Sequence, residues 1–243
     1  MLTLLKKEVN GFFSSFTGYV VIIVFLLLTS LFIWVLPGTM NILENSYASL
    51  DALFALAPWV FLFLVPAVTM RMFAEEKRSG TLELLVTRPV SELEIVIAKY
   101  LASWILVIIS IIPTLIFFIS VHSLGNPPGN IDTGGTWGSY IGLIFLGGIY
   151  ASIGIFSSSL TENQIVAFIL AVLFCFIFYI GFNYMSQISK TGEIVYLIEK
   201  FGINYHYQSI SRGVIDSRDI IYFISVITIF IYFTRIRLQS RKW

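Results

Sequence analysis

Six long apolar runs, none of which contains an acidic, basic or histidine side chain, alternate with shorter polar segments along the 243-residue chain. Each run approaches the roughly 20 residues that a helix needs to cross the hydrocarbon core of a bilayer. The pattern predicts an all-α membrane protein with six transmembrane helices, at residues 18–36, 53–70, 101–121, 137–156, 165–182 and 220–233. The last run is the shortest, and it crosses if Arg218 and Arg235 extend toward opposite interfaces.

The segment before the first run has the periodicity of an amphipathic helix. Within residues 1–17, Lys6 and Lys7 lie off a helical face that six apolar side chains form, Leu2, Leu5, Val9, Phe12, Phe13 and Phe16. Such a face suits a helix in the headgroup plane of a membrane, so we expect an N-terminal interfacial helix. The alternative is a frayed terminus, which would leave the aromatic spacing without a use.

Capping signals mark further helix ends between the runs. In the exterior segment 183–217, Thr191 as a cap and Gly202 as a stop bracket a helix with four apolar side chains, Ile194, Leu197, Ile198 and Phe201. We expect this helix to lie flat on the membrane. Before the fifth run, Thr161 and Gln164 have the spacing of a capping box.

Composition and the placement of charge narrow the class of protein. Hydrophobic residues make up 57% of the chain and charged residues 12%, which excludes a soluble globular fold. Lysine and arginine are absent between runs one and two and between runs three and four, and they gather before run one, between runs two and three and after run six. The segment between runs five and six also contains four of them. Positive residues favour the cytoplasmic side, so we expect both termini and residues 71–99 to be cytoplasmic.

Residues 71–99 are the most informative polar segment and read RMFAEEKRSGTLELLVTRPVSELEIVIAK. Gly80 interrupts the helix that continues from the second run, and Thr81 is placed to cap a short helix that extends to Val86. This short helix presents the leucines at 82, 84 and 85. Composition leaves two alternatives about even: the leucines fold back on the protein's own helices, or they dock on another subunit.

The second half of this segment contains a turn and a new helix start. Pro89 forces the preceding Arg88 toward extended geometry. Ser91 and Glu94 then have the spacing of a capping box, which begins the helix of the third run. The segment is therefore predicted to be a helix, a proline turn and a helix.

Ten residues of this segment resemble the signature loop of ABC-2 type permeases: Glu75, Glu76, Gly80, Thr81, Leu82, Glu83, Leu85, Pro89, Val90 and Lys99. The resemblance covers the whole chain and implies the ABC-2, type V exporter-like architecture. It implies that the loop is a coupling helix in a groove of a nucleotide-binding subunit, with eight contact residues, Arg78, Gly80, Thr81, Leu82, Glu83, Leu85, Arg88 and Pro89. Glu83 and Arg88 would supply polar or ionic contacts, and Leu82 and Leu85 would supply burial.

The resemblance also implies partners. A separate P-loop ABC ATPase would bind ATP and magnesium, and a second permease, identical or related, would make a homodimer or heterodimer in membrane lipid. More narrowly, residues 41–71 and 206–223 are similar to the permease of the gliding-motility ABC transporter of Bacteroidetes. That similarity implies a bacterial inner membrane and a role in substrate export or in an envelope machine.

Several kinds of chemistry are disfavoured. The chain has no P-loop motif of its own, and the runs lack the ionisable residues typical of proton-coupled carriers, ion pumps and intramembrane proteases. Cys175 is the sole cysteine, and His122 and His206 have no partners at ligand spacing, so we expect no metal or cofactor in this chain, no enzymatic activity and no nucleic-acid partner. The small residues of the fourth run suit close packing within the subunit. The alternative to transport is a non-transporting membrane module coupled to an ATPase.

Overall fold

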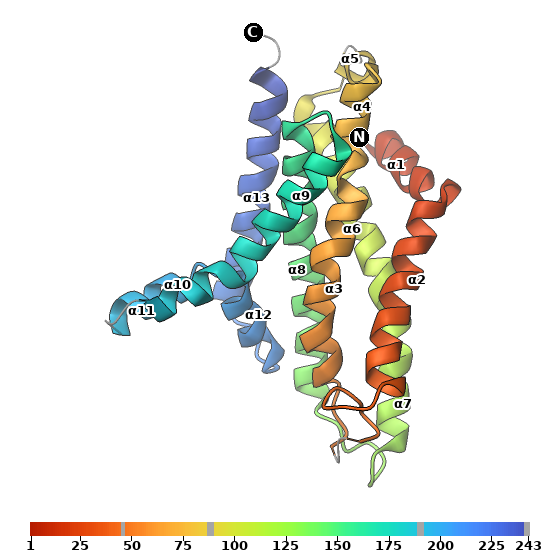
Figure 1. Cartoon of the computed structure of the whole chain (residues 1–243), viewed down its shortest axis with the longest axis vertical. Helices are drawn as coiled ribbons and strands as arrows, with labels where there is room; N and C mark the ends of the chain where they lie inside the picture. Colours follow the sequence, from red (N-terminus) through yellow and green to blue (C-terminus); the bar gives the residue numbers. More distant parts are fainter. Residues whose placement is uncertain (45–46, 87–89, 189–191, 241–243) are drawn as a thin grey trace.

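The structure, a computed structural model, describes residues 1–44, 47–86, 90–188 and 192–240, with side chains for all of these except 84–86, 188 and 192–194. In this part of the chain six helices are long and apolar enough to cross a membrane, and they stand side by side in one bundle (Figure 1). They coincide with the six predicted runs, and the described residues contain no strand. The predicted all-α membrane protein with six spans is confirmed.

The first three spans are built from consecutive helical pieces. Span one is α2 (Phe16–Ser30) with a π-helical turn, η1 (Leu31–Val35), and it follows α1 (Leu2–Ser14). Span two is α3 (Asp51–Thr69) with α4 (Arg71–Arg78), and α5 (Thr81–Val86) follows it. Span three is α6 (Glu92–Ile111), a short 3-10 turn η2 (Ile112–Thr114) and α7 (Leu115–Leu124).

The last three spans include one unbroken central helix. Span four is α8 (Thr133–Leu160), and span five is α9 (Gln164–Phe176), the π-helical turn η3 (Ile177–Gly181) and α10 (Phe182–Ile188). Two short helices, α11 (Gly192–Glu199) and α12 (Ile203–Ser211), precede span six, α13 (Ser217–Gln239). Helix α1, helix α5 and the end of α13 lie at the same end of the bundle, which we call the α5 end (Figure 1).

Helix α8 is the centre of the bundle because its small residues allow close approach on several sides. In its most apolar stretch 78% of residues are buried, against 22% in spans five and six. A methyl group at Gly138 would overlap the Ile210 carbonyl of α12, and one at Gly154 would overlap the Thr69 hydroxyl of α3. The prediction that these small residues pack within the subunit is confirmed.

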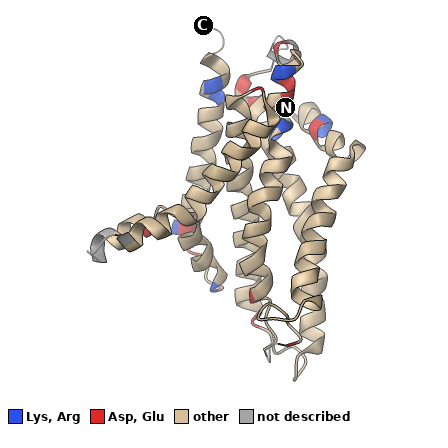
Figure 2. Cartoon of the chain, viewed as in Figure 1, with Lys and Arg blue, Asp and Glu red and all other residues tan. Residues whose placement is uncertain are grey.

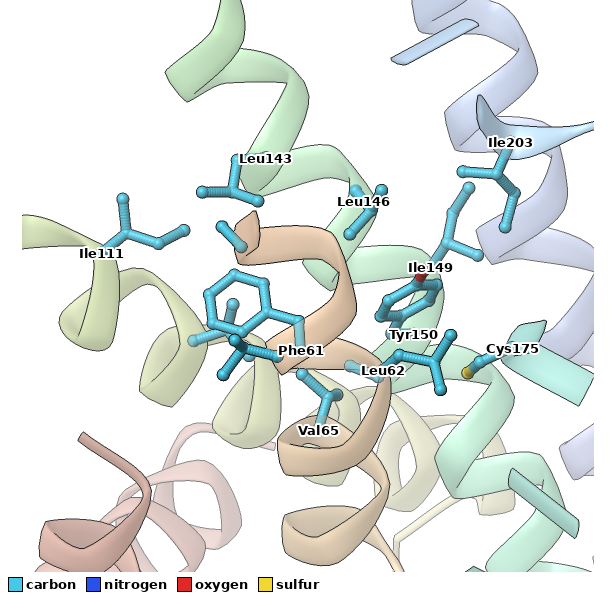
Figure 3. Packing of buried hydrophobic residues seen from close by; sticks show 14 of the residues in the cluster. Phe61, Leu62, Val65, Ile111, Leu143, Leu146, Ile149, Tyr150, Cys175 and Ile203 are labelled. Carbon is cyan, nitrogen blue, oxygen red and sulfur yellow. The ribbon is translucent and has the colours of Figure 1, made fainter. Parts of the chain in front are cut away.

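The core between α3 and α8 is closed by apolar side chains from several helices (Figure 3). Phe61, Leu62 and Val65 of α3 face a row on α8 that includes Leu146 and Tyr150. Ile111 of α6, Cys175 of α9 and Ile203 of α12 complete it, and all of these side chains are buried. Cys175 therefore has the packing role expected of a cysteine in an apolar run.

The N-terminal helix forms as predicted but ends earlier. Ser15 has extended backbone angles, φ −104° and ψ 155°, so α1 stops at Ser14 and Phe16 begins the first span. Phe16 is thus not part of the interfacial face and is 79% exposed, whereas Phe12 is buried against α3, α4 and α6 residues. The alternative of a frayed terminus is wrong, because α1 packs on the bundle.

One predicted cap between the spans differs in the structure. Asn163, not Thr161, caps α9, because the helix begins at Gln164 and the Asn163 side chain accepts from the Ile165 amide. Gly202 follows α11 as expected and also directly precedes α12, which the sequence pattern did not separate. Thr191 lies outside the described residues. By contrast, the Ser91 and Glu94 capping box is present at the start of α6 and is confirmed.

Candidate functional site

The charged end of the bundle contains the segment singled out from the sequence. Figure 2 shows that Lys, Arg, Asp and Glu gather around α1, α4 and α5 at this end, with a second group near α12, while the spans between are almost free of them. Helix α4 extends α3 beyond the bundle, and α5 turns back from its tip (Figure 1). This α4–α5 hairpin is the most protruding helical feature of the α5 end.

The turn between α4 and α5 depends on Gly80. Its φ of +70° lies in the left-handed region, which glycine adopts without the steric cost that a side chain brings. The Ser79 hydroxyl donates to the Glu75 carbonyl at 2.9 Å and lies 2.8 Å from the Thr81 hydroxyl, so the turn is hydrogen-bonded on its outer side. Thr81 is the first residue of α5 and not its cap, which corrects the prediction for that residue.

The side chains of α5 divide into an outward and an inward set. Thr81 and Glu83 are exposed, as is Arg78 at the end of α4. Leu82 is only 3% exposed and belongs to the main apolar core. The expectation that Leu82 supplies burial for a partner is therefore corrected: the leucine holds α5 on its own chain, as the first of the two alternatives had it. The side chain of Leu85 and residues Arg88 and Pro89 lie outside what the structure describes.

The junction between α3 and α4 is held by α8. The Ser158 hydroxyl accepts the amide protons of Phe73 at 3.0 Å and Ala74 at 3.1 Å, and it donates to the Met70 carbonyl at 2.7 Å. The Lys77 ammonium donates to the Ser159 carbonyl next to it. One buried hydroxyl thus satisfies three backbone groups where α3 passes into α4, so α4 is fixed to the end of α8.

A buried ion triad ties α4 to two further helices. The Lys99 ammonium of α6 lies 2.7 Å from a Glu76 oxygen on α4 and 3.1 Å from a Glu8 oxygen on α1. Lys99 is 1% exposed, and its ammonium also lies 5.3 Å from the centre of the Phe73 ring. A lysine is almost never buried this deeply unless it is paired, so the triad is a specific link between α1, α4 and α6.

The sequence pattern did not reveal this triad. Lys99 enters the sequence prediction as a residue that orients the chain and as part of the signature loop. Glu8 is not singled out, because it lies 91 positions from its partner. One local signal could have revealed a partner for Lys99. The lysine has mostly apolar neighbours in a helix that starts at Glu92, so its charge needs a partner within the protein.

The opposite half of the molecule has a second polar feature, a groove of about 320 Å³ between α3, α10 and α12. Four carboxamides line it, Asn183, Gln187, Asn204 and Gln208, together with Trp59 of α3 and Tyr184 of α10. The amides pair weakly along each helix, with Gln187 donating to Asn183 at 3.3 Å and Gln208 to Asn204 at 3.4 Å. The residues that line this groove include no charged side chain.

His206 has a carboxylate partner that its sequence position did not suggest. Its Nδ1 lies 2.7 Å from an Asp219 oxygen on α13, and its Nε2 lies 2.8 Å from the Lys200 carbonyl. The carbonyl oxygen can only accept, so Nε2 donates to it, and the roles in the Nδ1 contact depend on the tautomer of the ring. The ring also stacks on Tyr222 at 3.9 Å, and the pair fastens α12 to α13. The described residues contain no group of three or more His, Cys, Asp and Glu that could hold a metal.

Most of the chain, including the spans and the hairpin described above, matches a known protein family. The family model described as ABC-2 family transporter protein matches residues 36–236, which include spans two to five, the α4–α5 hairpin and all but the last three residues of span six. No curated protein matches the sequence significantly.

Proposed function

Because the chain belongs to the ABC-2 family of transporter proteins, and is thus the multi-pass permease component of an ABC transporter, we propose that α5 docks on a separate ATPase subunit. The observation that carries the proposal is the α4–α5 hairpin, which projects from the bundle and exposes Arg78, Thr81 and Glu83. These side chains offer one cation, one hydroxyl and one carboxylate to a partner surface. Leu82 anchors the hairpin from below.

Movement of α5 would reach the spans through rigid connections. The Ser158 hydroxyl joins α4 to α8, and the Lys99 triad joins α4 to α6 and α1. A packed and hydrogen-bonded element moves as a unit, because a close-packed interior does not deform continuously. A push on α5 would therefore tilt α3 and α4 as one unit about their contact with the end of α8.

The partners follow from the family and from the charge distribution. The ATPase would carry the P-loop and bind ATP and magnesium, and a second permease, identical or related, would complete the membrane unit. The lysine and arginine distribution supports cytoplasmic placement of the α5 end and of both termini in a bacterial inner membrane. The similarity of residues 41–71 and 206–223 supports a gliding-motility assembly as the cellular context.

One observation favours transport over a purely mechanical module. The groove of four carboxamides gives the outer half of the protein a neutral polar surface beside the exposed Trp59 of span two. These amides pair only weakly with one another and keep further donors and acceptors, which a passing amphipathic substrate would use and a module that only transmits force would not need. Export of such a substrate is the function that we propose.

Co-purification tests the docking. The tagged chain with Glu83→Arg is compared with wild type and with Arg237→Glu, an exposed charge reversal on α13 at the same end. We expect a P-loop ATPase with wild type and with Arg237→Glu, and its loss with Glu83→Arg while the chain stays folded. Recovery of no ATPase with any of the three, or equal recovery with all, would refute docking through α5.

A further inference from the structure

A cavity of about 440 Å³ lies at the α5 end between α1, α4 and α6, and it reaches Ser79 and Thr81 at the turn of the hairpin. Its walls carry three cationic and three acidic side chains, Lys7, Arg71, Lys99, Glu8, Glu75 and Glu76. We propose that this cavity binds the headgroup of a zwitterionic phospholipid with a primary amine, such as phosphatidylethanolamine. The proposal does not depend on docking of an ATPase.

The position of the cavity is that of a lipid headgroup. Helix α1 packs across the bundle where the apolar stretch of span two ends at Arg71 (Figures 1 and 2). Beyond the Ser15 elbow, α2 exposes Phe16 at 79% and Tyr19 at 48%, so an apolar surface for acyl chains begins beside the charged walls. Charged groups above and apolar side chains below match the two halves of a phospholipid.

The acidic side of the cavity, formed by Glu8, Glu75 and Glu76, suits a cation that carries hydrogen-bond donors. Lys99 brings one positive charge to two carboxylates, so the triad keeps one negative charge in excess when all three groups are ionised. The second oxygen of Glu76, Oε2, is enclosed by the protein and accepts no hydrogen bond from any described residue, so it adds to the negative potential of the wall without being open to the ligand itself. Glu75 adds an exposed carboxylate on the next position of α4. A primary ammonium supplies a charge and three N–H donors to such a wall.

The positive part of the site suits the adjoining phosphate. Arg71 is held over the Phe12 ring at 5.3 Å and near the Ser15 hydroxyl at 3.4 Å, which keeps its guanidinium at the elbow. Lys7 lies on α1 at the same cavity. Because cations and carboxylates balance in number, an anionic headgroup gains less binding free energy here than at a purely basic pocket. A zwitterion pairs with both the acidic and the basic side chains.

The cavity also has room that a variant can remove. Gly11 of α1 lines it, and a side chain added at Gly11 would meet no atom within 4 Å. Gly11→Leu therefore fills the cavity without removing a charge, and leucine favours the helix more than glycine does. Gly11→Ala is the matched control, because a single methyl group leaves most of the space.

The test measures thermal unfolding of the delipidated full chain by the fluorescence of its five tryptophans. Phosphatidylethanolamine, phosphatidylcholine and phosphatidylglycerol are added in matched mixed micelles. We expect phosphatidylethanolamine to raise Tm by about 5 °C more than phosphatidylcholine, which has the charge and the phosphate but no N–H donor. This difference should persist in Gly11→Ala, shrink in Glu75→Gln and vanish in Gly11→Leu.

Three results would overturn the proposal. Equal shifts with the choline lipid would mean that the amine is not recognised, and a larger shift with phosphatidylglycerol would indicate a basic site for anionic lipid. An unchanged difference in both Gly11→Leu and Glu75→Gln would place the lipid elsewhere. If Gly11→Leu does not fold, Glu75→Gln decides alone, since Glu75 is exposed and outside the buried triad.

Discussion

Removal of the Lys99 ammonium should destabilise the permease far more than removal of either carboxylate that it binds. Lys99→Met keeps the length of the side chain and deletes two ion pairs, at 2.7 and 3.1 Å. Glu8 and Glu76 would then face each other with side chains only 14% and 17% exposed and no cation between them. Breaking a buried pair on one side costs about 3–5 kcal/mol, and the cavity beside the two carboxylates lets water relieve part of that, so we expect about 3 kcal/mol.

Glu76→Gln and Glu8→Gln have a different effect on the charge balance. Each leaves Lys99 with one carboxylate, so the net charge of the triad changes from one negative to zero. The remaining pair is balanced, and the new amide still accepts a hydrogen bond. We expect each of these variants to cost about 1 kcal/mol or less.

Thermal unfolding in mild detergent measures the comparison. For a chain of this size about 1 kcal/mol corresponds to roughly 2–4 °C, so Lys99→Met should lower Tm by about 6–12 °C. Lys6→Met, at an exposed position of α1, should leave Tm unchanged. The triple variant with both glutamines and Met at 99 should recover most of the loss. A loss in Glu8→Gln as large as in Lys99→Met, or no loss in Lys99→Met, would refute the triad as the link between α1, α4 and α6.

Three further comparisons test the hairpin and the packing that supports it. Gly80→Val should cost about 2 kcal/mol and displace α5, because φ is +70° there, while Gly80→Asn should be nearly neutral; ATPase co-purification and Tm report both effects. Gly154→Ala should cost about 1–3 kcal/mol through overlap with the Thr69 hydroxyl, and Gly11→Ala, which meets no atom, should not lower Tm. Ser158→Ala should cost about 1–3 kcal/mol and speed amide exchange at Phe73 and Ala74, since it removes their acceptor; unchanged exchange would contradict the assigned contact.

The sequence predicted those features that depend on residues close together in the chain. Six apolar runs became six spans, and Ser91 with Glu94 became a capping box, because hydropathy and capping act within a few residues. Leu82 could not be assigned from composition, since an exposed and a core leucine in a short helix look alike.

Contacts between residues far apart in the chain could not be predicted from hydropathy and charge patterns. The Glu8–Lys99 and His206–Asp219 pairs join different helices, and charge counting treats Lys99 only as a marker of orientation. The cap of α9 was missed for a smaller reason: the helix starts two residues later than Thr161 would place it, so the Asn163 side chain accepts from the first free amides instead.

The length of the second span means that a small movement of the hairpin would become a larger movement at the far end of the span. Asp51 to Arg78 form one span of 28 residues, which is about 42 Å at 1.5 Å per residue, and the Ser158 hydroxyl holds the junction between its two helices. Pivoted near that junction, the arm beyond it to α5 is short and the arm to Trp59 and Ala55 is longer. A tilt of about 5° set by a shift of roughly 1 Å at α5 would sweep the far end through about 2–3 Å. In the proposed coupling, span two would convert a small displacement at the α5 end into a larger one at the carboxamide groove.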